Sequence, residues 1–455
     1  MIPSMSLLIR DATVITVDPE RRVLDPGAVY VEGTRIADVG PSAEVVRRHP
    51  QAERVVDGRR KVVIPGFVST HTHVGYTLFR GRAEDAGLAC VTGQYFPMST
   101  VVTRDERLAI GSLTYAELLR SGVTTVLEME EDADVYAPFV ERLGIRSAMG
   151  VMLHDVPVEE LRRGQYRFDP ALGEAQLRQA IGFAEAWHGR AEGRITALLT
   201  PNMTIGSSPA QLRAAREVAD RLGLRLSIHL GWGPSEVATT RRLHGQSPFE
   251  YASAHGLLRP DVVAAHCYVI DDADLALLAR SGARVAHCPL MNAVRGHIAP
   301  VQDLLARGVT VSLGIDNMFA DFFDVVRTAV LVARIRARDA VTMPSMQAIE
   351  LATLGGARAL GMEREIGSIE PGKRADLVVL DYRTFGLTPT LDPVQNLVYH
   401  AHARDVEMVL VDGRVVVDGR RVATVDAEAL IDPAQDAATA AWSRFVAKYG
   451  GILAT

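Results

Sequence analysis

Four histidines and one aspartate stand at the ends of apolar segments and are residue types that bind divalent metal ions. His71 and His73 end the run VVIPGFVSTHTH. Because the two residues lie two positions apart on an extended strand, their side chains point to the same side. His229, His266 and Asp316 end the runs RLSIH, VVAAH and VTVSLGID. One such residue is most simply a hydrogen-bonded core side chain, but five together favour a shared metal ion. Because such an ion generates hydroxide near neutral pH, the set predicts hydrolysis.

These residues meet only if their segments are neighbouring parallel strands. Apolar strands alternate with amphipathic helical stretches across the middle of the chain, and glycine or serine marks many of the joins. The predicted strands cover residues 62–70, 123–128, 146–152, 196–200, 225–229, 262–266, 284–288 and 309–316. Such alternation over about 250 residues is typical of a (β/α)₈ barrel, whose sites lie where the strands end. A doubly wound open sheet is disfavoured, because no glycine-rich phosphate loop follows the first strand.

The two ends of the chain differ from its middle. Short β-branched runs occur near both termini, and the Asp-Gly pairs at 412–413 and 418–419 predict hairpins. We therefore expect an α/β fold in which a TIM-like barrel is inserted in a small β-sandwich domain built from both termini. The predicted parts are 1–61 and 366–426 for the β-sandwich, 62–365 for the barrel, and 427–455 for an amphipathic terminal helix. This helix is expected to pack against a neighbour or against the β domain.

Composition excludes several classes of function. The chain has 55 acidic and 49 basic residues, so no basic excess is available to bind nucleic acid. Its three cysteines are too few for a disulfide framework and are expected to be buried free thiols. No targeting pattern begins the chain, and no apolar run reaches about 18 residues. We expect a soluble, cytoplasmic protein whose partner is a small molecule, with no membrane association.

Several motifs, in this order along nearly the whole chain, resemble those of the amidohydrolase superfamily. They are PGFVSTHTH, the HL and HC pairs after strands five and six, AHCPLMN, LGIDN, and the tail AIELATLGGARALGMEREIGSIEPGKRADLVVLD. Within the superfamily the chain is most similar to the branch of triazine hydrolases, cytosine and guanine deaminases, and adenosine-type deaminases with a composite β domain. Relatives of this kind are usually dimers or tetramers, so a homodimer or homotetramer is expected.

The resemblance implies a site with one metal ion. Its ligands would be His71, His73, His229 and Asp316, and His266 would lie beside the bound water or substrate. Zn²⁺ is expected first, with Fe²⁺ or Mn²⁺ as alternatives. Superfamily members with two metals often bridge them with a carboxylated lysine, but no lysine occurs between residues 61 and 373. Glu128 or Glu130 is an alternative bridge, although acidic groups lining a polar barrel mouth are the favoured interpretation.

The chain departs from the ring deaminases of this branch at one position. Those enzymes usually carry a proton-shuttling glutamate three residues after the strand-five histidine, where this chain has Trp232. Glu236 is a candidate replacement, although a glutamate that caps or flanks the following helix is the favoured interpretation. Trp232 is suited to stacking on a flat ring. The other predicted substrate contacts are Tyr95, Asn202 and Asn292.

We therefore predict a mononuclear metal-dependent hydrolase that cleaves a C–N bond of a small, nitrogen-containing, heterocyclic or aromatic substrate. Asp316 would take a proton from the attacking water and deliver it to the leaving group, and His266 would donate a hydrogen bond to the developing charge. A dehalogenase of chlorinated heterocycles is an alternative with the same site. A non-catalytic barrel scaffold is a third possibility, which the retained ligand set disfavours.

Overall fold

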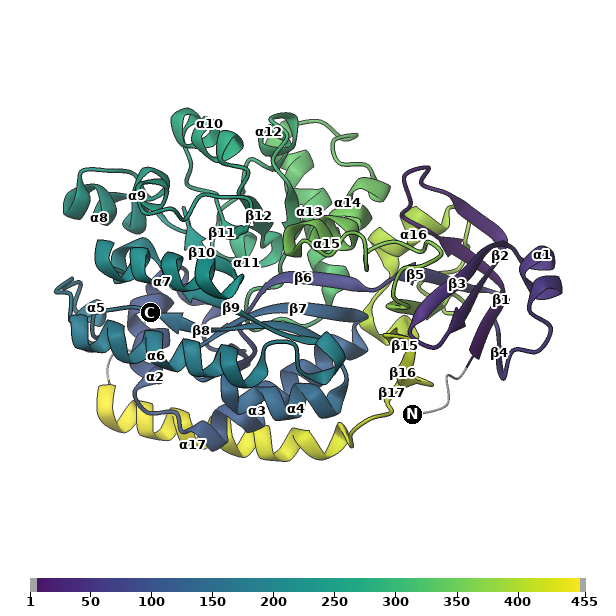
Figure 1. The fold of residues 1–455 in the computed structure, drawn as a ribbon, viewed down its shortest axis with the longest axis horizontal. Helices are drawn as coiled ribbons and strands as arrows, with labels where there is room; N and C mark the ends of the chain where they lie inside the picture. The colour runs from purple at the N-terminus through teal and green to yellow at the C-terminus, as the bar shows by residue number, and fades with distance from the viewer. Residues whose placement is uncertain (1–5, 451–455) are drawn as a thin grey trace.

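In the computed structural model, which describes residues 6–450, eight parallel strands are hydrogen-bonded in chain order (Figure 1). They are β6 (Phe67–Thr72), β7 (Val123–Glu130), β8 (Arg146–Leu153), β9 (Ile195–Pro201), β10 (Arg225–Leu230), β11 (Val262–His266), β12 (Arg284–His287) and β13 (Val311–Leu313). Every residue of β6, β7 and β11 is buried, as expected for parallel strands with helices outside and packed side chains inside. The predicted barrel is confirmed.

The barrel closes between its first strand and the segment that follows its last strand. Thr72 and Asp316 form a parallel bridge. The backbone N–H of His73 donates to the carbonyl of Asp316 at 2.8 Å, and the N–H of Asp316 donates to the carbonyl of His71 at 3.0 Å. The hydrogen bonds of the seam therefore join two of the predicted ligand segments directly.

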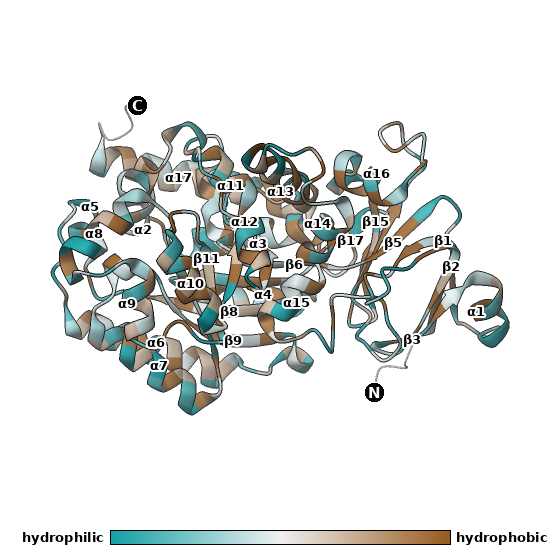
Figure 2. Ribbon diagram, turned by 90° about the horizontal axis from the view of Figure 1, so that it is seen from above, coloured by the Kyte–Doolittle hydropathy of each residue, from teal (hydrophilic) through white to brown (hydrophobic). Residues whose placement is uncertain are grey.

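Helices cover the outside of the barrel, and further helices occupy the loops after the strands. The first set comprises α3 (Arg104–Arg120), α4 (Ala133–Leu143), α6 (Pro170–Trp187), α7 (Pro209–Leu222), α10 (Asp272–Ser281), α13 (Phe322–Ala337), α14 (Ser345–Ala352) and α15 (Leu354–Leu360). The second set comprises α2 (Phe96–Ser99), α5 (Val158–Arg162), α8 (Pro234–His244), α9 (Pro248–Ala254), α11 (Pro289–Val294) and α12 (Val301–Ala306). Figure 2 shows the apolar residues concentrated on the strands and on the helix faces that meet them. No helix among residues 6–450 is long and apolar enough to cross a membrane.

Strands from both ends of the chain form a second, nine-stranded sheet. They are β1 (Ser6–Ile15), β2 (Val23–Glu32), β3 (Arg35–Pro41), β4 (Arg54–Asp57), β5 (Lys61–Pro65), β14 (Leu377–Asp381), β15 (Val406–Val411), β16 (Arg414–Asp418) and β17 (Arg421–Val422). The two halves meet where β5 pairs antiparallel with β14, and the sheet has an apolar core of its own. Helices α1 (Ser42–Arg48) and α16 (Pro393–His400) flank it.

One expectation about the joins between these parts was wrong. The predicted strand 62–70 is two strands: β5 belongs to the terminal sheet and β6 to the barrel, so residues 62–65 lie outside the barrel. Gly66 separates them, and a Cβ there would overlap the side chain of Thr124.

The terminal helix α17 (Ile431–Tyr449) packs on α3 and α2 of the barrel, as Figure 1 shows, so of the two expected packing partners it takes a neighbouring part of the chain. The indole N–H of Trp442 donates to the carbonyl of Leu78 at 2.9 Å. The apolar face of α17 thus covers the segment that follows the first barrel strand. The predicted helix range extends to residue 455, and its last five residues lie outside the described residues.

A buried ion network joins the barrel to the terminal sheet. Arg146 begins β8, and its Nη2 lies 2.7 Å from Oδ1 of Asp412 and 3.3 Å from both carboxylate oxygens of Asp376. Asp412 also accepts a hydrogen bond from Arg374 at 2.8 Å. Arg146, Asp376 and Asp412 are almost inaccessible to solvent.

We expect Arg146→Met to destabilise the fold by about 3–5 kcal/mol at neutral pH, because it leaves Asp376 buried without a cation and leaves Asp412 with Arg374 alone. Burial already raises the pKa of Asp376, and Arg146 opposes that rise. Without Arg146 the pKa of Asp376 rises further above that of the unfolded chain, so the deficit should shrink as the pH is lowered toward 5. Denaturation of both proteins at several pH values measures this. Arg178→Met, which removes an exposed arginine, should cost less than about 0.5 kcal/mol. A deficit independent of pH would contradict the interpretation.

Candidate active site

Two imidazole nitrogens face each other at the mouth of the barrel without a proton between them. Nδ1 of His73 donates to the carbonyl of Met129 at 2.7 Å, and Nδ1 of His229 donates to the carbonyl of Asn202 at 2.7 Å. Each neutral ring carries its proton on the donating nitrogen, so both Nε2 atoms present lone pairs. These two atoms lie only 3.1 Å apart. A cation between them removes the repulsion of the facing lone pairs.

His71 and Asp316 complete this cluster. Neither ring nitrogen of His71 has a hydrogen-bond partner, although the side chain is fully buried. Oδ1 of Asp316 lies 3.8 Å from Nε2 of His71 and 4.0 Å from Nε2 of His73. Burial, followed by the neighbouring imidazoles, lowers the pKa of His71 well below its usual range. Burial also lowers the pKa of His73. The rings are therefore neutral and free to act as ligands.

The four side chains fit a divalent metal ion. Zinc binds imidazole nitrogen and carboxylate oxygen at about 2.0–2.2 Å, so tetrahedral ligand atoms lie about 3.4 Å from one another. The separations of 3.1–4.0 Å given above bracket that value. Neither ring nitrogen of His71 has a hydrogen-bond partner, and a bound ion would provide one of them with a partner. The expected ligands are brought together.

His266 borders the same cluster: its Nε2 lies 3.9 Å from Oδ2 of Asp316, and its ring centroid lies 5.1 Å from that of His71. Its Nδ1 lies 3.1 Å from Oδ1 of Asn292; with the proton on Nδ1, this atom donates to Asn292 and Nε2 is an acceptor. The hydrogen bond from His266 to the developing charge stays a prediction. Both His266 and Asp316 have left-handed backbone angles, with φ of 74° and 69°. Such strain is typical of functional sites, where the surrounding fold holds it in place.

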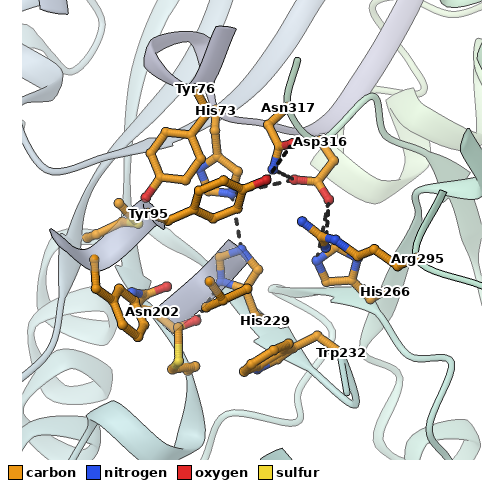
Figure 3. Close-up of a pocket in the computed structure, with 14 residues that line it drawn as sticks. His73, Tyr76, Tyr95, Asn202, His229, Trp232, His266, Arg295, Asp316 and Asn317 are labelled. Carbon is orange, nitrogen blue, oxygen red and sulfur yellow. Dashed lines mark hydrogen bonds and ion pairs between the residues drawn. The ribbon is translucent and has the colours of Figure 1, made fainter. Parts of the chain in front are cut away.

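A pocket opens onto this cluster (Figure 3). The side chains that line it are His73, Tyr76, Val91, Tyr95, Phe96, Met152, Asn202, Met203, His229, Trp232, His266, Arg295, Asp316 and Asn317. Trp232, Tyr95 and Asn202 thus lie where the sequence predicted substrate contacts. Asn292 does not line the pocket; it braces His266 from behind.

Glu236 also lies outside the pocket, against the expectation of a catalytic role. It stands in the first turn of α8, fully buried. Its Oε2 accepts the backbone N–H of Trp232 at 2.9 Å, and its Oε1 accepts the hydroxyl of Thr204 at 2.9 Å. Burial raises the pKa of Glu236 to about 8. This side chain therefore positions the loop that carries Trp232.

The acidic pair at the end of β7 is also engaged by backbone. Oε1 of Glu128 accepts the N–H of Val74 at 3.0 Å, and Oε1 of Glu130 accepts the N–H of Gly75 at 2.8 Å. Neither carboxylate belongs to a metal-type cluster with the histidines of the described chain. The pair holds the turn directly after His73, in agreement with a site for one metal ion.

Three pocket residues with polar groups were missed by sequence reasoning. Nδ2 of Asn317 donates to Oδ1 of Asp316 at 2.8 Å, and Nη1 of Arg295 lies 3.5 Å from Oδ2 of the same carboxylate. Tyr76 stacks on His73 with ring centroids 5.0 Å apart. Adjacency to Asp316 could have indicated Asn317. Arg295 lies 21 positions from Asp316 and carries no local signal in the sequence.

A parallel barrel with a histidine–carboxylate cluster at its C-terminal mouth defines a metal-dependent hydrolase. The chain belongs to the amidohydrolase family, whose model matches residues 62–416. A second model, the imidazolonepropionase-like composite domain of bacteria, matches residues 27–52 in the terminal sheet. The chain is therefore an enzyme, a hydrolase of carbon–nitrogen bonds of the deaminase or amidohydrolase type. The scaffold alternative is excluded.

Individual relatives agree with this assignment. The chain is 36% identical over 442 residues to the 5-methylthioadenosine/S-adenosylhomocysteine deaminase of Desulforudis audaxviator, covering 95% of this chain and 98% of that protein. A zinc-bound adenosine deaminase from Xanthomonas campestris superposes with a TM-score of 0.89 at 30% identity, covering 96% of this chain and 98% of that one. The zinc complex of atrazine chlorohydrolase from Arthrobacter aurescens TC1 has a TM-score of 0.85 at 22% identity, covering 95% and 100%, and shows the shared fold.

Glu236→Gln should leave kcat within about threefold of the wild-type value. The protonated carboxyl and the amide have the same shape, and the amide can accept from Trp232 while donating to the hydroxyl of Thr204. Glu236→Ala, which leaves that N–H without its acceptor, should raise KM. Steady-state kinetics measures both. A proton shuttle at this position would instead make the glutamine variant about 10²–10⁴-fold slower.

Proposed function

We propose that this enzyme is a mononuclear, zinc-dependent aminohydrolase that releases ammonia from a small nitrogen heterocycle. The observation that carries the proposal is the pair of unprotonated Nε2 atoms of His73 and His229, 3.1 Å apart beside Asp316 on the wall of the pocket. His71, His73, His229 and Asp316 would hold the ion. A bound divalent ion would lower the pKa of a water molecule toward about 7.

The side chains of the pocket would then carry the proton. Nε2 of His266 accepts a hydrogen bond from the attacking water, and Oδ2 of Asp316 takes its proton. The water oxygen bonds to the ring carbon, and Asp316 passes the proton to the exocyclic nitrogen. The C–N bond breaks, ammonia leaves, and the hydroxyl left on the ring tautomerises to an oxo group. Asn317 and Arg295 keep the carboxylate in place during both transfers.

The aromatic lining supports a flat substrate. Trp232, Tyr95 and Tyr76 present ring faces or edges to the pocket, and Asn202 adds a polar group. The relatives named as deaminases of adenosine-type compounds support loss of an amine from a ring. Dehalogenation, in which chloride leaves such a ring, stays an alternative prediction, and no group in the site favours it.

Purified protein should contain about one equivalent of divalent metal per chain, with zinc predominating after expression in zinc-containing medium. His229→Ala should lose most of it, because the cluster keeps only two imidazoles and a carboxylate. His400→Ala, an exposed histidine on α16, should retain it. Elemental analysis measures all three proteins. Full activity in metal-free protein would disprove the proposal.

A panel of amino- and chloro-substituted heterocycles, assayed for ammonia and chloride, should yield ammonia alone. Asp316→Asn should lower kcat by at least about 10³-fold while the folded protein remains, because no other pocket carboxylate can move the proton. Circular dichroism checks the fold. Chloride release without ammonia would replace this function with dehalogenation.

We further expect the enzyme to be a homodimer or homotetramer, and analytical ultracentrifugation of the metal-loaded protein measures this oligomeric state. We also expect it to lie in the cytoplasm. Binding of nucleic acid is not expected from a chain with a net charge of −6.

A further inference from the structure

One wall of the pocket is formed by residues 83–96, which lie between the first barrel strand and α3. This segment supplies Val91, Tyr95 and Phe96 to the pocket lining. It pairs with no strand, and within the described chain its backbone hydrogen-bonds to other backbone only between residues 79 and 100. The position of this wall is therefore set by the side chains that pack on the segment and hold its ends.

Helix α17 holds both ends of the segment. Before it, the indole N–H of Trp442 donates to the carbonyl of Leu78 at 2.9 Å. After it, Nε of Arg444 donates to the carbonyl of Val101 at 3.0 Å. These bonds join residues that are 364 and 343 positions apart in the sequence. A helix from the far end of the chain thus fixes the two ends of a wall of the pocket.

A row of aromatic rings connects α17 with the pocket. The rings of Trp442 and Phe79 meet edge to face with centroids 5.9 Å apart, and the centroid of Phe79 lies 4.5 Å from that of Tyr95. The hydroxyl of Tyr95 donates to Oδ1 of Asn317 at 3.5 Å, and Asn317 donates in turn to Asp316 (Figure 3). The row therefore leads from the helix to the carboxylate of the site.

We propose that Trp442 is a positioning residue of the active site, which keeps Tyr95 in the pocket wall through Phe79. This inference rests on the proposed function, because it requires the substrate to bind in this pocket. An indole suits the position, since its ring packs on Phe79 while its N–H holds the carbonyl of the preceding residue. Phenylalanine can do only the first of these, and leucine neither. Helix α17 thus sets the affinity of the pocket for a flat substrate without touching that substrate.

Steady-state kinetics on the best substrate of the heterocycle panel tests this role. Trp442→Leu should raise KM at least about tenfold and leave kcat within about threefold, because Tyr95 loses its support while the metal ligands keep theirs. Trp442→Phe, which retains an aromatic ring against Phe79, should recover most of the loss. Phe183→Leu, which shortens a buried aromatic side chain on α6, should leave both constants near the wild-type values. Elemental analysis and circular dichroism check that each variant keeps its metal and its fold.

A double-mutant cycle identifies the residue through which Trp442 acts. Tyr95→Ala should raise KM by itself, because it removes a side chain from the pocket wall. Adding Trp442→Leu to this variant should then raise KM by less than about twofold, since the supported ring is already absent. Two effects that multiply independently would overturn the proposal.

Fluorine NMR gives a readout that does not depend on turnover. The chain has 11 tyrosines, and after labelling with fluorotyrosine the resonance of Tyr95 is the one lost in Tyr95→Phe. Trp442→Leu should shift or broaden this resonance, and Phe183→Leu should leave it unchanged. Arg444→Met replaces a side chain that is 42% exposed, so its fold should survive even where Trp442→Leu does not fold. It frees the other end of the segment and should broaden the same resonance.

The role of Trp442 and the proposed function can fail separately. An unmoved Tyr95 resonance and an unchanged KM in Trp442→Leu would overturn the role and leave the aminohydrolase standing. Equal rises of KM in Trp442→Leu and Phe183→Leu would also overturn it, since Trp442 would then only stabilise the fold. Absence of ammonia from every heterocycle would reject the aminohydrolase, and the fluorine spectra would still decide whether Trp442 positions Tyr95.

Discussion

The seam that closes the barrel is the constraint on which the site depends. A cyclic sheet of parallel strands must pair its last strand with its first, and here the pairing is carried by backbone bonds among His71, His73 and Asp316. The carboxylate and two imidazoles are thereby placed by main-chain geometry. Asp316 accepts a left-handed φ of 69° to do so. The same backbone hydrogen bonds therefore close the barrel and position three of the expected ligands.

Burial makes this arrangement both costly and useful. Four of the five polar side chains at the barrel mouth are almost inaccessible to solvent, His229 is partly exposed, and His71 has no hydrogen-bond partner. Backbone carbonyls of neighbouring strands fix the tautomers of His73 and His229, so their lone pairs converge. The unfavourable desolvation of neutral rings and one carboxylate is offset when a cation binds. Folding thus prepares a site that an ion completes.

Around this centre the charged groups divide between the pocket and the wall behind it. The carboxylate of Glu236 lies behind the wall, where it orders the loop of Trp232. The indole of Trp232 lines the pocket itself, and the guanidinium of Arg295 lies 3.5 Å from the carboxylate of Asp316. Asp316 is thus the one carboxylate, and Arg295 the one arginine, among the described residues that line the pocket.

The sequence by itself determined the barrel, the pairing of both termini in one β domain, and the cluster of His71, His73, His229, His266 and Asp316, because strand periodicity and strand-end position are local properties. Only the tertiary structure decided that residues 62–65 belong to the terminal sheet and that α17 covers the barrel. It also decided the role of Glu236, the hydrogen bond between His266 and Asn292 and the presence of Arg295. All of these features depend on contacts between segments that are distant in the sequence, because such contacts decide which side chains are buried and which groups they hydrogen-bond.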